Sequence, residues 1–70
     1  MVLTINFWLN GQIYYTIKKQ TLSNIIQYFN LNQSFLVLEH NGFVCNKEMW
    51  SEIFVSNDDQ IEIVTIVGGG

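Results

Sequence analysis

Alternation of apolar and polar positions predicts that most of this chain forms β-strands. In residues 3–9 apolar side chains recur at every second position, at Leu3, Ile5, Phe7 and Leu9. This period places them on one face of a strand. Asn10-Gly11 follows, a strong signal for a tight hairpin turn. Residues 12–17 are therefore expected to return as a second strand, in which two adjacent tyrosines leave open which face is buried.

A helical period then replaces the strand period. Apolar residues lie at positions i, i+3, i+4 and i+7, namely Leu22, Ile25, Ile26 and Phe29. Thr21 precedes them as a suitable N-cap, and Asn30 is the expected end of the helix. A helix of about two turns is not stable in isolation, so it must pack on the sheet.

The middle of the chain predicts a return to the sheet. Residues 35–39 are almost continuously apolar, as in a strand covered by the helix. Asn41-Gly42 predicts a second tight turn into a short strand over residues 43–45. Residues 47–52 are expected to cross as a short irregular or helical segment, with Trp50 as its anchor.

The order of these elements predicts the fold. Residues 57–59 are expected to form a turn, and residues 60–67 the last strand. The whole predicts an α+β domain over residues 1–67: a β-grasp (ubiquitin-like) fold, with a mixed sheet of four to five strands and one main helix on one face. Crossover handedness favours the strand after the helix lying parallel beside the first strand, with the last strand at the centre. A ferredoxin-like fold, the main alternative, needs a second helix.

Length and composition narrow the class of protein. Seventy residues make one domain, and one cysteine and one histidine provide neither a disulfide nor a metal site. A formal net charge of −3 argues against nucleic-acid binding and suits a basic protein partner. We therefore expect no bound cofactor or metal.

Two features bear on location. We find neither a signal-peptide pattern nor an apolar run of the roughly 18 residues that span a membrane. The chain lacks Ala, Arg and Pro and is rich in residues with AT-rich codons, as expected from a low-GC genome such as an organelle's. The prediction is a cytoplasmic protein, or a protein of the plastid stroma if an organelle encodes it.

The most informative segment is Gly68-Gly69-Gly70, which directly follows the last predicted strand. Glycine has no Cβ and reaches backbone angles closed to other residues. Residues 68–70 are therefore predicted to be a thin, flexible tail able to enter a narrow channel. The reactive group at its tip is the α-carboxylate of Gly70, so the chain's own terminus is the predicted chemical handle.

The side chains that could act as reactive or metal-binding groups are expected to have structural roles instead. Cys45 is expected to be a small buried hydrophobe rather than a redox site or persulfide acceptor, since no basic neighbour in sequence lowers its pKa. His40 has no companion nucleophile or acid in the pattern and is expected to be a solvated surface histidine. Asp58-Asp59 is expected to be a turn and not a cation site.

The last predicted strand suggests a docking surface. If Ile61 and Ile63 face the helix, Val64 and Ile66 point outward close to the glycine tail. An exposed apolar patch there is a candidate docking site for partners. The alternative is that an adjacent strand or the chain's own loops cover it.

Several of these features together resemble the sulfur-carrier protein of thiamine biosynthesis (the ThiS family). The family pattern runs from a tight turn after a strand to a Trp anchor. This chain matches it at Asn41-Gly42, Val44, Lys47, Glu48 and Trp50. An acidic turn at 57–59, an Ile-rich strand and a terminal Gly69-Gly70 complete the pattern, with Gly68 as an extra spacer. Asn46 in place of Pro, Lys47 in place of Arg, and a turn without its central Gly depart from it, all in loops.

The resemblance implies a specific chemistry. An ATP-dependent activating enzyme, an adenylyltransferase, adenylates the Gly70 carboxylate. Sulfur from a cysteine desulfurase system then gives a C-terminal thiocarboxylate, and thiazole synthase takes up that sulfur. The resemblance thus implies that the chain is a protein co-substrate and not an enzyme. It implies no catalytic residue in this chain, because the partners carry out the catalysis.

Other functions share the same terminus. The small subunit of molybdopterin synthase and the ubiquitin-related modifiers that sulfurate tRNA use the same fold, although such chains usually run longer. A ubiquitin-like modifier joined to lysines needs the same Gly-Gly end. A plain interaction module with an inert tail is the remaining alternative.

Overall fold

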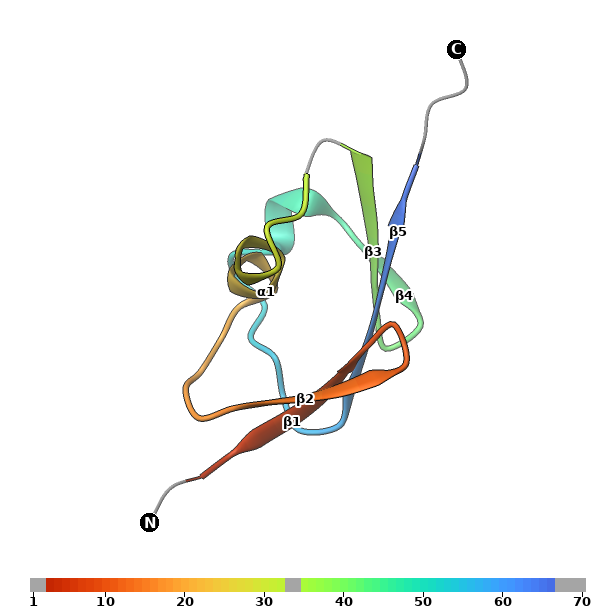
Figure 1. The fold of residues 1–70 in the computed structure, drawn as a ribbon. Helices are drawn as coiled ribbons and strands as arrows, with labels where there is room; N and C mark the ends of the chain where they lie inside the picture. The colour runs from red at the N-terminus through yellow and green to blue at the C-terminus, as the bar shows by residue number, and fades with distance from the viewer. Residues whose placement is uncertain (1–2, 33–34, 67–70) are drawn as a thin grey trace.

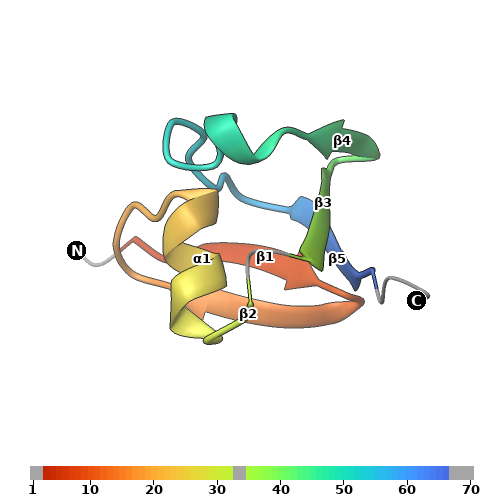
Figure 2. The same ribbon diagram turned by 90° about the horizontal axis from the view of Figure 1, so that it is seen from above.

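The computed structural model describes residues 3–32 and 35–66. Its elements, in chain order, are β1 (Ile5–Leu9), β2 (Gln12–Thr16), α1 (Leu22–Tyr28), β3 (Leu36–His40), β4 (Phe43–Cys45), a 3-10 turn η2 (Lys47–Met49) and β5 (Asp59–Thr65). The strands form one sheet, and α1 lies across one of its faces (Figures 1 and 2). Within this described part, no helix has the length and apolar character needed to cross a membrane.

The sheet confirms the predicted β-grasp. Its five strands follow the order β2-β1-β5-β3-β4, so the last strand is the central one, as expected. One detail of the prediction is wrong. β3, the strand after the helix, does not pair with β1, because β5 lies between them, parallel to β1 and antiparallel to β3. The parallel crossover therefore joins the first and last strands of the chain.

The two Asn-Gly turns form as predicted. Asn10 and Gly11 have φ values of 50° and 81°, and Asn41 and Gly42 have values of 53° and 87°. Two consecutive positive φ values match the right-handed twist of the flanking strands, and Asn and Gly tolerate them best. β1 and β2 thus pair from Ile5–Thr16 to Leu9–Gln12. Strand β1 begins two residues later than expected, and Leu3 before it is 75% exposed.

Helix α1 follows the predicted period and cap. The Thr21 hydroxyl accepts a hydrogen bond from the Asn24 N–H (3.1 Å), and the Asn24 side chain accepts one from the Thr21 N–H (3.2 Å). This reciprocal capping box satisfies two of the donors that begin a helix. Leu22, Ile25 and Ile26 are buried against the sheet. Asn30, at φ 53°, ends the helix in the left-handed region.

The core lies between α1 and the inner face of the sheet. Its buried members are Phe7, Leu9, Leu22, Ile25, Ile26, Leu38, Trp50, Val55 and Ile61. Trp50 is 2% exposed, which confirms its predicted role as an anchor, and its Nε1 donates to the Cys45 carbonyl (3.0 Å). Tyr14 packs edge-to-face on Phe29, whereas Tyr15 is exposed. The face of β2 that carries Tyr14 is therefore the buried one, which the sequence had left open.

Candidate functional site

The predicted reactive tail lies outside the described residues. Gly68, Gly69 and Gly70, together with Val67 at the end of the predicted domain 1–67, therefore stay as predicted from sequence. The described chain runs to Ile66, immediately before them. The candidate site is the part of the fold that leads to this tail: strand β5, its anchors and its exposed face.

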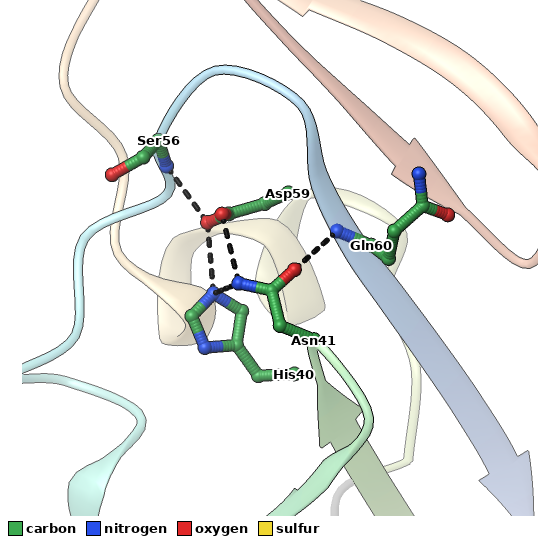
Figure 3. Close-up of polar contacts among 5 residues, drawn as sticks. All are labelled: His40, Asn41, Ser56, Asp59 and Gln60. Atoms are coloured by element: carbon green, nitrogen blue, oxygen red, sulfur yellow. Dashed lines mark hydrogen bonds and ion pairs between the residues drawn. The ribbon is translucent and has the colours of Figure 1, made fainter.

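The first residue of β5 is a buried carboxylate that ties the strand to the β3–β4 hairpin. Asp59 is 7% exposed and accepts three hydrogen bonds (Figure 3). His40 Nε2 donates to its Oδ2 (2.8 Å), the Ser56 N–H donates to the same oxygen (2.8 Å), and Asn41 Nδ2 donates to Oδ1 (3.1 Å). Asn41 Oδ1 in turn accepts from the Gln60 N–H (2.8 Å). The base of the central strand is thus fixed by side chains.

This network corrects two expectations. His40 is not a solvated surface residue, because its side chain is only 21% exposed and pairs with Asp59. Asp58, at φ 68°, does lie in the predicted turn, but Asp59 already belongs to β5. The turn itself is held to β1, since Asn6 Nδ2 donates to Asp58 Oδ1 (2.7 Å) and the Asp58 N–H donates to the Asn6 carbonyl (2.7 Å).

The pKa of Asp59 lies below its ordinary value. Burial by itself raises the pKa, but the hydrogen bonds from His40, Ser56 and Asn41 and the attraction of the His40 charge outweigh it. A carboxyl whose pKa falls on folding stabilises the native state above its unfolded value of 3.8. That contribution is lost as the pH falls through the lower folded value.

We therefore expect Asp59→Asn to flatten the acid side of the stability profile. In the wild type the free energy of unfolding falls as the pH drops below about 5, whereas the variant shows a smaller slope there. At neutral pH the variant is less stable by roughly 1–3 kcal/mol, because a charged acceptor of three hydrogen bonds is lost. Urea titrations from pH 3 to pH 7 measure both effects. An unchanged acid slope in a folded variant would contradict the assignment.

The exposed face of the strand end is apolar. Val64 and Ile66 are each 53% exposed and lie on the sheet face opposite α1. Val37 of β3 lies directly across from Val64, so its half-buried side chain shares that face. Val37, Val64 and Ile66 are called the outer patch below. The described strands and loops therefore cover Val64 and Ile66 only in part.

Other candidate side chains do not form a second site. Burial raises the pKa of the Cys45 thiol, which disfavours the thiolate that a nucleophile or persulfide acceptor needs. Cys45 is half-buried and lines a shallow hollow with His40 and Met49. Across residues 3–32 and 35–66, three or more metal-binding side chains do not cluster anywhere.

One contributor to the site was missed by sequence reasoning. Asn10, singled out only as a turn residue, also holds β5: its Oδ1 accepts from the Ile63 N–H (2.7 Å) and its Nδ2 donates to the Ile63 carbonyl (3.3 Å). The sequence carries no signal for this contact, which joins residues 53 positions apart. The asparagine of a hairpin turn is chosen for its backbone angles, so its side chain attracts no separate prediction.

Comparison with known proteins points to one family. The model of the ThiS family matches residues 7–70. "Uncharacterized protein ycf40" of Trieres chinensis is 56% identical over 64 residues, covering 91% of this chain and 88% of its own. A protein of the same description from Porphyra purpurea is 26% identical over 66 residues, covering 94% and 93%. "Sulfur carrier protein ThiS" of Bacillus subtilis (strain 168) is 32% identical over 50 residues, covering 71% and 76%.

A solved structure agrees with the fold. The thiamine biosynthesis protein ThiS from Geobacter metallireducens superposes with a TM-score of 0.78, covering 94% of this chain and all of its own. At 23% sequence identity the likeness concerns the architecture alone. The match agrees with the five-stranded sheet and single helix described above.

Proposed function

This chain belongs to the ThiS family, and we propose on that basis that it is a sulfur carrier for the thiazole ring of thiamine. The observation that carries the proposal is the family match itself, which spans residues 7–70 and so includes both the β-grasp and the terminal glycines. In this proposal Gly70 is the reacting residue, Gly68 and Gly69 form the tail, and catalysis belongs to partner enzymes.

The proposed chemistry follows from the weakness of a carboxylate as an electrophile. An adenylyltransferase joins the Gly70 carboxylate oxygen to the α-phosphate of ATP and releases pyrophosphate. A persulfide sulfur from a cysteine desulfurase system then displaces AMP. The product is an acyl disulfide with a new C–S bond, and reductive cleavage of its S–S bond by a thiol leaves the thiocarboxylate. Thiazole synthase takes that sulfur. No cofactor is required on the carrier, because ATP is bound by the activating enzyme.

The fold supports this role mechanically. The tail follows the central strand, which is held at its base by Asp59 and at its middle by Asn10. Contacts between the folded domain and a partner, remote from the reacting carboxylate, can use their binding energy to position that group. A glycine tail then delivers the carbonyl without side-chain clashes.

The relatives support a proposal about the origin of the gene. The proteins named ycf40 belong to plastid genomes, which agrees with the low-GC composition and favours an organelle-encoded gene. We propose a cytoplasmic protein, or a protein of the plastid stroma if an organelle encodes it.

We further propose that the outer patch is part of the docking surface for the adenylyltransferase. Val64→Asp is then expected to weaken binding by about tenfold, because a charge is buried without a partner. Stability is expected to change by less than about 0.5 kcal/mol, since Val64 is exposed. Tyr15→Asp is the matched control, because Tyr15 lies on the same sheet face but on β2. Unchanged affinity in folded Val64→Asp would remove the outer patch from the proposal.

Intact mass spectrometry tests the function directly. The chain is incubated with ATP, a recombinant adenylyltransferase of a ThiS-family carrier, a cysteine desulfurase, cysteine and a thiol reductant. A mass gain equal to sulfur replacing one oxygen supports a sulfur carrier. Lysine-linked conjugates support a ubiquitin-like modifier, and no change supports an inert module. Transfer of the sulfur to purified thiazole synthase, but not to the large subunit of molybdopterin synthase, separates thiamine from the alternative pathway.

A further inference from the structure

Strand β5 has a hydrogen-bonding partner along only part of one side. Its ladder with β1 runs from Phe7–Asp59 to Leu9–Ile61. At Asn10 the chain turns away into β2, but the Asn10 N–H still donates to the Ile61 carbonyl (2.9 Å). The Asn10 side-chain amide then bonds both the N–H and the carbonyl of Ile63. A side chain thus replaces one peptide unit of the missing strand, and the internal pairing on this side ends with it.

Thr65 is the next residue on that side. Backbone groups of a strand point alternately to its two neighbours. The Ile66 N–H donates to the Phe35 carbonyl of the β3 side (2.7 Å), whereas Ile63 bonds Asn10 on the β1 side. Thr65, two residues after Ile63, therefore directs its N–H and carbonyl to the β1 side. Among the described residues nothing lies there to pair with them, and Figure 1 shows β5 running on past the β1–β2 turn.

The open edge has the chemistry of a strand-binding site. A central strand is normally paired along both sides, and an N–H and carbonyl left unpaired beside each other are matched by the backbone of an extended peptide. A strand added to this edge would lie about 4.8 Å from β5. Alternate side chains of the added strand would then contact Val64 and Ile66 of the outer patch. The edge and the patch therefore form one continuous surface beside the tail.

We propose that an extended, apolar segment of the adenylyltransferase adds to β5 at the Thr65 edge as a short extra strand. This inference rests on the proposed function and adds the geometry of recognition to it. The segment pairs with the residue that leads into the tail, so the same contact that binds the carrier also sets the direction of Gly70. A second copy of this chain is disfavoured as the occupant, because Glu62 on the same face and a net charge of −3 are repeated in each copy.

Amide hydrogen exchange of two neighbouring residues tests the proposal. In the free chain the Ile66 N–H is bonded within the sheet and the Thr65 N–H is open, so Thr65 is expected to exchange much faster. On binding the adenylyltransferase without ATP, Thr65 exchange is expected to slow by roughly tenfold or more, while Ile66 changes little. Fast exchange at Thr65 in the complex overturns the proposal. Protection of Thr65 in the free chain that rises with concentration also overturns it, in favour of self-pairing.

A backbone variant gives a second readout. Replacing the Thr65 amide by an ester in a synthetic chain removes the open N–H and leaves the side chain in place. The ester also makes the Val64 carbonyl, which faces β3, a weaker acceptor, so the melting temperature of the variant is measured beside its KM. The KM for carrier-dependent pyrophosphate release is expected to rise roughly 3- to 10-fold. An unchanged KM in the ester variant overturns the inference about strand addition but leaves the proposed function standing. Absence of pyrophosphate release with the wild-type chain overturns the proposed function itself.

Discussion

Removal of Gly69 and Gly70 is expected to abolish formation of the thiocarboxylate while leaving the melting temperature unchanged. Two residues span up to about 7 Å, so the terminal carboxylate of the truncated chain stops well short of the reacting position. Misplacement of a reacting group by only 1 Å costs about 100-fold in rate. We therefore expect at least a 100-fold loss in pyrophosphate release, and no sulfur gain by intact mass spectrometry.

Deletion of Gly68 alone is the informative control. This variant keeps the Gly69-Gly70 terminus and shortens the tail by one residue, so it separates the length of the tail from the identity of its end. Activity close to that of the wild type assigns Gly68 as a spacer, and loss of activity assigns it to the required reach. Should the chain without Gly69 and Gly70 accept sulfur as well as the intact chain, the proposal that Gly70 reacts is wrong.

Substitution of Trp50 by Ala is expected to remove much of the stability of the domain. Trp50 is 2% exposed, and its removal leaves a large cavity between η2 and the core. Substitutions of this type cost about 3–5 kcal/mol. A domain of this length is typically stable by roughly 3–10 kcal/mol, so little stability remains. Thermal unfolding followed by far-UV circular dichroism should show a melting temperature lowered by roughly 15 °C or more.

Trp50→Phe separates the stability lost with the packing of the side chain from the stability lost with its hydrogen bond. Phe refills most of the cavity but has no N–H, so the Cys45 carbonyl loses the hydrogen bond it accepts from Trp50. We expect a loss of roughly 1–3 kcal/mol, clearly smaller than that of Trp50→Ala. If Trp50→Ala melts within a few degrees of the wild type, Trp50 does not anchor the segment.

Features encoded by neighbouring residues were predictable from the sequence. The helix needed only the period of Leu22, Ile25 and Ile26 and the cap at Thr21, all within six residues. Both hairpin turns needed only Asn-Gly, because the required positive φ values are local properties. The exposure of Val64 followed from the two-residue period of a strand whose other face is buried.

Features that depend on distant residues were not predictable in the same way. His40 meets Asp59 across 19 positions, so this partly buried hydrogen bond cannot be predicted until the strand order is known. The order itself was predicted only in part: the last strand was expected at the centre, but crossover handedness was taken to favour β3 as the parallel neighbour of β1. The structure assigns that position to β5, which also brings Ile63 within reach of Asn10.

The position of β5 also has a consequence for how the protein is made. The β1–β2 and β3–β4 hairpins pair only with themselves until β5 is inserted between them, since β1 and β3 do not touch as strands. Their union depends on contacts such as Phe7–Asp59, which are remote in sequence and form late. A nascent chain interrupted before residue 59 therefore lacks the element that joins its halves and is exposed to proteolysis. Completion of the sheet is thus tied to synthesis of its last strand, the strand that leads to the glycines.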